Sequence, residues 1–220
     1  TAATLSAGTE DTAYVIRVSD LLKGYTDADE GDTLSIANLT TSRGTLVNNN
    51  DGTYTLNLPA NYNGPVQLSY GVTDGIATTN TTQSFNVTSV NDVPTLTGTA
   101  ATLSAGTEDT TYTVTAADLL KGYTDVELSS LTITNLTPSV GTIVNNNDGT
   151  YTITPPANYY GAVTLNYGVT DGTDTTAATQ SFTITSVNDV PTLTDTAATL
   201  SAGTEDTAYV IRVSDLLKGY

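Results

Sequence analysis

The chain of 220 residues contains no cysteine, histidine, methionine or tryptophan. Without cysteine it can form no disulfide, no zinc–thiolate site and no thiol nucleophile. Without histidine it lacks the usual general base and the commonest metal ligand. Lysine and arginine together number 6 against 23 aspartates and glutamates, so the formal net charge is −17. Such a chain repels nucleic acids and anionic membranes and attracts cations, and we expect no nucleic-acid partner.

Long apolar runs are also missing. No segment approaches the length of a membrane-spanning helix, so we expect no insertion into a membrane. No signal peptide is visible, but the sequence starts in the middle of a repeated pattern. We therefore expect it to be an excerpt of a longer chain, whose compartment cannot be read from its first residues.

Internal repetition is the main feature of the sequence. Residues 1–25 return letter for letter at residues 196–220, and a diverged copy occupies residues 99–123. Later landmarks, among them VNNNDGTYT, YGVTDG and SVNDVPTLT, recur in the same order at a spacing of 97 to 98 residues. A regular period of this kind indicates tandem structural units. We expect repeat 1 at residues 1–92, repeat 2 at residues 93–189 and the incomplete start of a third repeat at residues 190–220.

Within each repeat, apolar and polar residues alternate with the period of half-buried strands. Tyr14 and Ile16 stay apolar in the second copy, whereas Val15 and Arg17 become threonine, which predicts that the latter pair faces water. Further strands are expected at residues 1–7, 34–36, 54–58 and 66–72, with the last beginning at residues 85–87. Short strands divided by turns at this spacing predict an all-β fold of tandem Greek-key β-sandwiches, immunoglobulin-like and with about seven strands each.

Local signals predict the connections between the strands. Asp-Gly at Asp51 and again at Asp148 is a strong signal for a two-residue hairpin, because such a turn needs positive φ. In SDLLKGY, Ser19 is the expected N-cap and Gly24 the closing glycine of one helical turn. Tyr62, just before a strand, is either a corner tyrosine of the immunoglobulin type or a plain packing residue.

The acidic residues gather in turns and at strand ends, and therefore at the ends of a sandwich. Solvated turn chemistry explains several of them, above all Asp51 and Asp148. The segment TDADEGD, which includes Glu30 and Asp32, places several carboxylates within six residues. At about 5 Å and an effective dielectric of about 20, each like-charged pair costs roughly 3 kcal/mol. A divalent cation reverses that sign, and oxygen ligands without histidine or cysteine suit Ca²⁺ best.

Four motifs, GTEDT, TDADEGD, YGVTDG and the linker VNDVP, resemble those of bacterial cadherin-like repeats, which occur in tandem in very long secreted adhesins of the RTX type. The resemblance covers the whole chain. It implies Ca²⁺ at each domain junction, bound by a glutamate near the first strand, the linker, an acidic pair and an aspartate of the last hairpin. Two departures matter: the Asp-Arg-Glu motif of animal cadherins is missing, and repeat 2 reads TDVELSS for TDADEGD. We therefore expect fewer or more weakly bound ions at the central junction.

Carried over position by position, the resemblance implies three sets of ligands. The set between repeats 1 and 2 comprises Glu10, Asn91, Asp92, Asp125, Glu127 and Asp171. The set at the next junction comprises Glu108, Asn188 and Asp189, with partners beyond residue 220. The set that faces a preceding unit comprises Asp27, Asp29 and Asp74. Asp11 and Asp109, beside the two glutamates, either support the ligands or are simply solvated.

The resemblance implies an extracellular extender of a cell-surface adhesin, in which neighbouring repeats of the same chain are the partners. Pro94 and Pro191 stiffen the linkers because proline fixes φ and restricts the preceding residue. The alternative is a β-sandwich module that binds a carbohydrate or protein ligand. Binding of sugars would need an exposed aromatic platform, for which Tyr25 and Tyr62 are candidates. We expect no enzyme, because only carboxylates could act and none is separable from turn chemistry.

Residues 196–220 lack the strands that would complete a third sandwich, and a lone strand-and-turn segment cannot bury a core. Since they repeat residues 1–25, two arrangements are open. Residues 1–25 complete the first sandwich and residues 196–220 pack elsewhere, which we favour. Otherwise residues 196–220 replace residues 1–25 in a neighbouring molecule and link chains head to tail.

Overall fold

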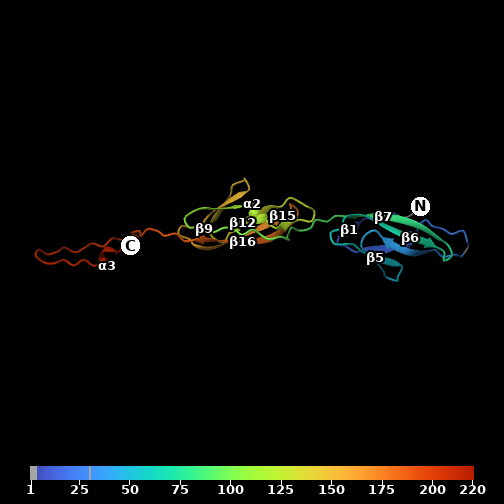
Figure 1. Ribbon diagram of the computed structural model, residues 1–220, viewed down its shortest axis with the longest axis horizontal. Helices are drawn as coiled ribbons and strands as arrows, with labels where there is room; N and C mark the ends of the chain where they lie inside the picture. The colour runs from blue at the N-terminus through green and yellow to red at the C-terminus, as the bar shows by residue number, and fades with distance from the viewer. Residues whose placement is uncertain (1–3, 30) are drawn as a thin grey trace. The chain divides into compact units, whose positions relative to one another are not determined.

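A computed structural model describes residues 4–29 and 31–220 (Figure 1). Residues 1–3 and Glu30 lie outside the described residues, so part of the expected leading strand and one acidic residue of TDADEGD are not placed. The chain divides into two compact units. Unit 1 contains residues 1–99, 122–132 and 169–176, and unit 2 contains residues 100–121, 133–168 and 177–220.

Repeat 1 folds into two sheets around one core. One sheet has the strand order β1 (Gly8–Thr9), β7 (Thr78–Thr88), β6 (Gly64–Thr73) and β3 (Ser35–Thr41). The other has the order β2 (Tyr14–Arg17), β5 (Thr53–Asn57) and β4 (Thr45–Asn48). β1 runs parallel to β7, and the other pairs are antiparallel. Since the chain crosses from one sheet to the other after β1, β2, β3 and β5, the predicted sandwich of about seven strands is confirmed for the described part of repeat 1.

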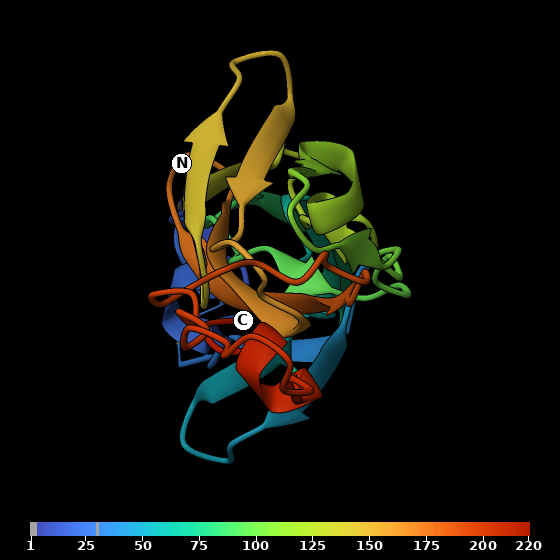
Figure 2. The ribbon, with the colours of Figure 1, turned by 90° about the vertical axis from the view of Figure 1, so that its left-hand side faces the viewer.

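Repeat 2 has the same order of strands. Its larger sheet runs β12 (Thr132–Pro138), β15 (Gly161–Thr170), β16 (Thr175–Thr185) and β9 (Gly106–Thr107), and its smaller sheet runs β10 (Tyr112–Thr115), β14 (Thr150–Thr154) and β13 (Thr142–Asn145). A separate pair, β8 (Thr95–Leu96) with β11 (Tyr123–Thr124), lies in unit 1. The hairpins β4–β5 and β13–β14 each project from their own sandwich (Figure 2).

The core of repeat 1 lies between its two sheets. Ile16 and Leu56 come from the smaller sheet, and Val66 and Phe85 from the larger one, and all four are buried. Full burial of such a side chain contributes roughly 1.5–3 kcal/mol. Val15 is 51% exposed, so the predicted assignment of faces on β2 is confirmed.

Stacked aromatic rings close one side of each core. The ring of Tyr14 lies 4.0 Å from that of Phe85, and Tyr112 lies 3.8 Å from Phe182 in repeat 2. A Cβ atom at Gly8 would lie 3.1 Å from the Tyr14 ring, tighter than ordinary contact. Glycine therefore allows β1 to approach this pair.

The predicted helical turn is present, but its N-cap was assigned wrongly. Helix α1 (Val18–Leu22) is capped by Arg17, which makes no side-chain capping bond, and not by Ser19. Burial of Leu21 fits this earlier start, because the chain turns directly from β2 into the core. In repeat 2 helix α2 (Ala116–Leu120) begins after Thr115, whose hydroxyl oxygen accepts a bond from the Asp118 amide at 3.0 Å. Gly24, at φ +85°, closes the turn as predicted.

Three strand boundaries differ from the prediction. The described residues 4–7 are not a strand, and only β1 follows them. β7 begins at Thr78 and not near residue 85, because its polar first half pairs with β6 through the backbone and needs no apolar alternation. The hairpin between β4 and β5 has residues 49–52 in its loop, with positive φ at Asn50 and Gly52, so it is longer than the predicted two-residue turn.

Turn chemistry accounts for the aspartates of these hairpins. Asp51 Oδ1 accepts bonds from the Thr53 hydroxyl at 2.6 Å and the Thr53 amide at 3.0 Å, and these bonds hold the pKa of Asp51 below its usual value. Asp148 is held in the same way by Thr150, and its pKa is lowered for the same reason. The structural interpretation of both residues is confirmed.

Residues 196–220 contain one helical turn, α3 (Val213–Leu216), and no strand. Val210 is 79% exposed and Val213 is 70% exposed, so these side chains are not buried against the described part of the chain, and the packing of this segment elsewhere stays a prediction. The amides of Thr194 and Asp195 donate to the carbonyl of Gly219, as those of Thr97 and Gly98 donate to the carbonyl of Gly122. No helix among the described residues is long and apolar enough to cross a membrane.

Candidate metal centre

Three carboxylates from distant parts of the sequence meet in unit 1. One oxygen from each of Glu10, Asp92 and Glu127 lies within 4.8 Å of the other two. Glu10 follows β1, Asp92 belongs to the linker after β7, and Glu127 lies in the loop after β11. The sequence reasoning placed all three in one ligand set, and the structure brings them together.

Sheet pairing positions Glu10. The parallel pairing of β1 with β7 continues one residue further, where the Glu10 amide donates to the Thr88 carbonyl at 3.1 Å. Its side chain is only 2% exposed. Oε1 accepts a bond from the Val90 amide at 2.6 Å, and Oε2 accepts one from the Asn63 side chain at 3.4 Å. The glutamate thus holds the start of the linker against repeat 1.

The linker and the loop after β11 supply the other carboxylates. The Asp92 amide donates to Glu127 Oε2 at 3.1 Å. Asp125 is 7% exposed, and its Oδ1 accepts a bond from the Ser129 amide at 3.1 Å. Buried oxygens that lack a hydrogen bond include Asp92 Oδ2, Asp125 Oδ2 and Glu127 Oε1. A buried carboxylate oxygen without a donor is unfavourable unless a cation or a proton pairs with it.

The ionised form of the Asp92 carboxylate is unfavourable at this place. Burial raises the pKa of Asp92, and the carboxylates of Glu127, Asp11, Glu10 and Asp125 raise it further. For a carboxylate whose pKa is raised by folding, the ionised form opposes folding. This penalty grows as the pH rises from the unfolded pKa to the folded pKa and stays in full above it. A bound cation would remove it.

A second group of polar side chains surrounds Asn91. Its side-chain amide donates to Asp171 Oδ2 at 2.8 Å and to Asp174 Oδ2 at 2.9 Å. The amides of Asp174 and Thr173, and then the Asn91 side chain, lower the pKa of Asp171. Asp174 was missed by the sequence reasoning. Comparison of TDGTDT in repeat 2 with TDGIAT in repeat 1 could have found it, since only repeat 2 has an aspartate there.

The oxygen ligands of this cluster suit a hard divalent cation. The set contains only oxygen ligands, carries several negative charges and includes buried oxygens that no protein group satisfies. Ca²⁺ accepts six to eight oxygens from carboxylates, carbonyls and water. Glu10, Asp92, Asp125 and Glu127 would hold such an ion, with Asn91 and Asp171 next to them.

The set expected to face a preceding unit is only partly brought together. Asp27, Asp32 and Asp74 each place one oxygen within 4.8 Å of the others, and the sequence set had Asp29 in the place of Asp32. The amide of Asp29 instead donates to Asp27 Oδ1 at 2.9 Å. The amides of Ala77 and Ile76 lower the pKa of Asp74. Asp27 and Asp32 are exposed, and no buried oxygen without a partner is found in this group within the described part of the chain.

Of the set expected at the next junction, only Glu108 is buried. Glu108 is 4% exposed, and its Oε1 accepts a bond from the Val187 amide, as Glu10 does from Val90. Asn188 and Asp189 are exposed, and the Asn188 amide donates to the Asp189 carbonyl at 3.0 Å. Within the described residues no further carboxylate joins them in a cluster.

Asp11 and Asp109 have a structural role in both repeats. Asp11 Oδ1 accepts a bond from the Asn61 amide at 2.9 Å, and Asp109 Oδ1 accepts one from the Asn158 amide at 2.8 Å. These bonds tie the turn after β1 or β9 to the turn before β6 or β15. Asp11 also contributes to the raised pKa of Asp92, so it lies close enough to act on the candidate centre.

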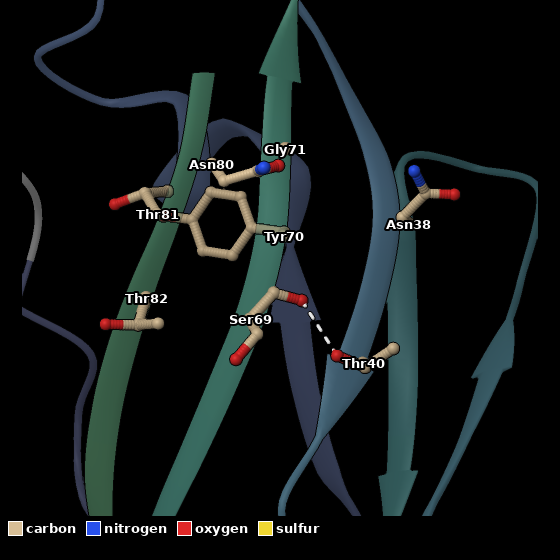
Figure 3. Close-up of a pocket in the computed structure, with 8 residues that line it drawn as sticks. All are labelled: Asn38, Thr40, Ser69, Tyr70, Gly71, Asn80, Thr81 and Thr82. Atoms are coloured by element: carbon tan, nitrogen blue, oxygen red, sulfur yellow. Dashed lines mark hydrogen bonds between the residues drawn. The ribbon is translucent and has the colours of Figure 1, made fainter. Parts of the chain in front are cut away.

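Tyr25 and Tyr62, the two candidates for an aromatic platform, pack against the core. The Tyr62 hydroxyl donates to the Pro65 carbonyl at 2.7 Å, three residues downstream, whereas a corner tyrosine of the immunoglobulin type bonds to the backbone upstream. A shallow cavity of about 500 Å³ lies over β3, β6 and β7 (Figure 3). Asn38 and Asn80 line it, and the Thr40 hydroxyl donates to the Ser69 carbonyl there at 3.1 Å. None of the described residues that line this cavity is charged.

Comparison with a family sequence model agrees with this fold. The sequence model of the cadherin-like domain matches residues 1–88 and again residues 90–185. No curated protein gives a significant match. Among solved structures, Drosophila N-cadherin EC1-4 shares 10% identity at a TM-score of 0.47, over 72% of this chain and 42% of that one. Human protocadherin-24 EC1-2 shares 14% at 0.43, over 73% and 85%.

An endo-fucoidan hydrolase of glycoside hydrolase family 107 is also similar, with 22% identity and a TM-score of 0.33. The match covers 84% of this chain but 28% of the hydrolase, so the chain spans little more than a quarter of that protein. Likenesses at this distance do not bear on function.

Proposed function

Because the chain belongs to the cadherin-like domain family, we propose that it is a structural extender module of a cell-surface adhesin. In this proposal Ca²⁺ stiffens the junction between successive repeats, the module works outside the cell, and it catalyses no reaction. Its partners are the neighbouring repeats of the same chain. The adhesive function belongs to other parts of the parent protein.

One observation carries the proposal. Buried carboxylate oxygens without a hydrogen bond come from the linker, at Asp92, and from the loop of repeat 2, at Asp125 and Glu127, while the buried Glu10 of repeat 1 lies beside them. A cation held by all of these residues would connect repeat 1, the linker and repeat 2 through single oxygen–metal contacts. Without the cation, the same carboxylates repel one another.

The ion would act chiefly on stiffness and only modestly on stability. Extracellular Ca²⁺ modules bind with a Kd of roughly 10⁻⁴ to 10⁻³ M. At ten times its Kd, one ion stabilises the folded state by about 1.4 kcal/mol. Each sandwich has its own buried core, so removal of Ca²⁺ should loosen the junction before it unfolds either sandwich.

Calorimetric titration with calcium chloride tests the proposal directly. The chain should bind Ca²⁺ at millimolar concentration or below, and Asp92→Ala should weaken that binding. Asp51→Ala is the matched control, because it removes the same charge from a residue that is explained by its hairpin. Absence of binding heat, together with a melting temperature that Ca²⁺ does not change, would contradict the proposal. Small-angle scattering that is identical with Ca²⁺ and with a chelator would contradict the stiffening.

A ligand-binding module is the second candidate, and one residue favours it. Tyr160 is 66% exposed in repeat 2, where repeat 1 has Asn63, so it offers an aromatic face that neither Tyr25 nor Tyr62 provides. A glycan array would distinguish the two functions. Binding of a glycan that Tyr160→Ala abolishes would support this alternative, and silence of the array would count against it.

Self-association belongs to the same proposal as a secondary property. Residues 196–220 carry the same apolar side chains that residues 1–25 bury, and here these side chains are exposed. They could therefore replace residues 1–25 in a second molecule and link chains head to tail. A monomeric mass at high concentration would argue against this exchange.

A further inference from the structure

The two repeats carry their acidic residues at different places. In repeat 1, Asp32 joins Asp27 and Asp74 in one group of carboxylates. Repeat 2 reads TDVELSS in the corresponding loop and has no carboxylate to match Asp32. It has instead Asp174, in the hairpin between β15 and β16, where repeat 1 has Ala77. In repeat 2 the TDVELSS loop thus lacks the carboxylate of Asp32, and the hairpin between β15 and β16 carries one that repeat 1 lacks.

The hairpin does not need this carboxylate for its own structure. In repeat 2 the Asp174 amide donates to Asp171 Oδ1 at 2.7 Å, and the Thr170 hydroxyl donates to the Asp174 carbonyl at 2.6 Å. In repeat 1 the Ala77 amide donates to Asp74 Oδ1 at 2.7 Å, and a threonine hydroxyl donates to the Ala77 carbonyl at 2.6 Å. The same turn therefore forms with alanine, and the Asp174 carboxylate is available for another role.

Asn91 shows where that carboxylate is directed. Its side-chain nitrogen lies 2.8 Å from Asp171 Oδ2, 2.9 Å from Asp174 Oδ2 and 3.1 Å from the Asp92 carbonyl oxygen. An amide NH₂ group has two protons, so it cannot donate fully to three acceptors. Three oxygens that converge on one point, two of them charged, are a better match for a cation. The amide of asparagine can present its oxygen in place of its nitrogen with almost no change of shape.

A second observation points to an ion at the same place in the chain. Asp125 is 7% exposed, and its Oδ2 atom has no hydrogen-bond partner. Asp92 is the neighbour of Asn91 in the linker. Its carbonyl oxygen accepts the Asn91 side-chain amide at 3.1 Å, and its own amide donates to Glu127 Oε2 at 3.1 Å. The group around Asn91 is therefore continuous with the cluster of unsatisfied carboxylates, and it is not an isolated set of surface acids.

We propose that Asp174 is a ligand of a cation at the junction, together with Asp171, and that the Asn91 side chain turns its oxygen toward the same ion. The hairpin of repeat 2 thereby supplies the carboxylate that its TDVELSS loop lacks. This inference rests on the proposed function. It also moderates the expectation of weaker binding at the central junction, because Asp174 replaces one of the two carboxylates, those matching Glu30 and Asp32, that the TDVELSS loop lacks.

Calcium titration of four proteins tests this role: the unaltered chain, Asp174→Ala, Asp174→Asn and Thr173→Ala. Asp174→Ala should raise the Kd for Ca²⁺ at least tenfold, which corresponds to about 1.4 kcal/mol. Asp174→Asn should fall between it and the unaltered chain, because the amide keeps one oxygen but loses the charge. Thr173→Ala is the control, since its exposed side chain is adjacent in sequence and its backbone bond to Asp171 is kept.

Thermal unfolding in a chelator separates a ligand from a structural residue. If Asp174 serves the ion, its removal relieves repulsion with Asp171, and the melting temperature without Ca²⁺ should stay the same or rise. A lower melting temperature in the chelator with an unchanged Kd would show that Asp174 is only a hydrogen-bond acceptor and would overturn the inference.

The two proposals can fail separately. Binding that Asp92→Ala weakens and Asp174→Ala leaves unchanged would overturn the role of Asp174 and keep the proposed function. A chain that binds no Ca²⁺ at all would overturn both.

Discussion

Residues 1–25 and residues 196–220 have the same sequence, and only the first of them is built into a core. Near the start of the chain, Ile16 and Leu21 are each 1% exposed, and two strands frame the segment. At residues 196–220 the corresponding Ile211 is 49% exposed and Leu216 is 58% exposed, and no strand forms. The apolar alternation that predicts strand β2 is therefore present in both copies, but a strand forms only in the first.

The features that persist in both copies are local. The Tyr14 hydroxyl donates to the Ser6 carbonyl at 2.8 Å, and the Tyr209 hydroxyl donates to the Ser201 carbonyl at the same distance. Helix α3 likewise reproduces the turn of α1. What is lost depends on remote residues, because β2 pairs with β5 over four residues and β1 pairs with β7. Strand formation reflects packing against neighbours more than intrinsic preference, whereas a helical turn closes its own hydrogen bonds.

The largest difference should appear when the same isoleucine is truncated in each copy. Ile16→Ala leaves a cavity between the sheets, and we expect it to lower the free energy of unfolding of repeat 1 by about 2–5 kcal/mol. Ile211→Ala removes an exposed side chain and should change it by less than about 0.5 kcal/mol. Urea denaturation followed by amide exchange in β5 and β6 measures both. Equal losses would mean that residues 196–220 also contribute to a core.

A charged substitution should reveal whether the second copy can replace the first. Ile16→Asp prevents residues 1–25 from docking on β5, so residues 196–220 of another molecule gain a vacant strand position with the same register. We expect this variant to form concentration-dependent oligomers in sedimentation equilibrium. The double variant Ile16→Asp/Ile211→Asp is the control and should stay monomeric. If the double variant associated to the same degree, the oligomers would arise from contacts between exposed core residues and not from the exchange of residues 196–220.

The glutamates of the two copies should differ in their effect on Ca²⁺. Glu10 is buried beside Asp92 and Glu127, while Glu205, its counterpart, is exposed. Because affinity depends on the number of charged ligands, Glu10→Gln should raise the Kd for Ca²⁺ roughly tenfold and Glu205→Gln should leave it unchanged. Calorimetric titration measures both. A loss of affinity in Glu205→Gln equal to that in Glu10→Gln would indicate binding by overall charge and not at a defined site.

The sequence predicted what depends on period and repetition. The alternation at Tyr14 and Ile16 gave the correct buried face, and the spacing of turns gave the sandwich. The resemblance selected Glu10, Asp92 and Glu127, which the structure brings together. The buried face, the sandwich and these ligands could be predicted because the motifs that carry them recur in the chain.

The features that sequence reasoning missed depend on contacts that no local pattern records. The first half of β7 is polar and is a strand only because β6 lies beside it. Asp32, and not Asp29, joins Asp27 and Asp74, because the course of an irregular loop decides which carboxylate turns inward. Asp174 has no counterpart in repeat 1, so reasoning from the motifs that both repeats share passed over it, and its contact with Asn91 is what places it beside the linker.

The smallest expected effect concerns the cap of the helical turn. In repeat 2 the Thr115 hydroxyl oxygen accepts the Asp118 amide, whereas Arg17 leaves the corresponding position in α1 without a side-chain cap. Arg17→Thr should therefore raise the free energy of unfolding of repeat 1 by about 1 kcal/mol, the usual contribution of such a cap. Arg212→Thr, the same change in the second copy, should leave it unaltered, because α3 has no buried residue that couples it to a core. Urea denaturation of the two variants beside the unaltered chain measures the difference. If Arg17→Thr did not raise the free energy of unfolding, the docking of Leu21 in the core would already hold the turn without a cap. The local bonds of residues 1–25 would then contribute less to stability than their persistence in residues 196–220 suggests.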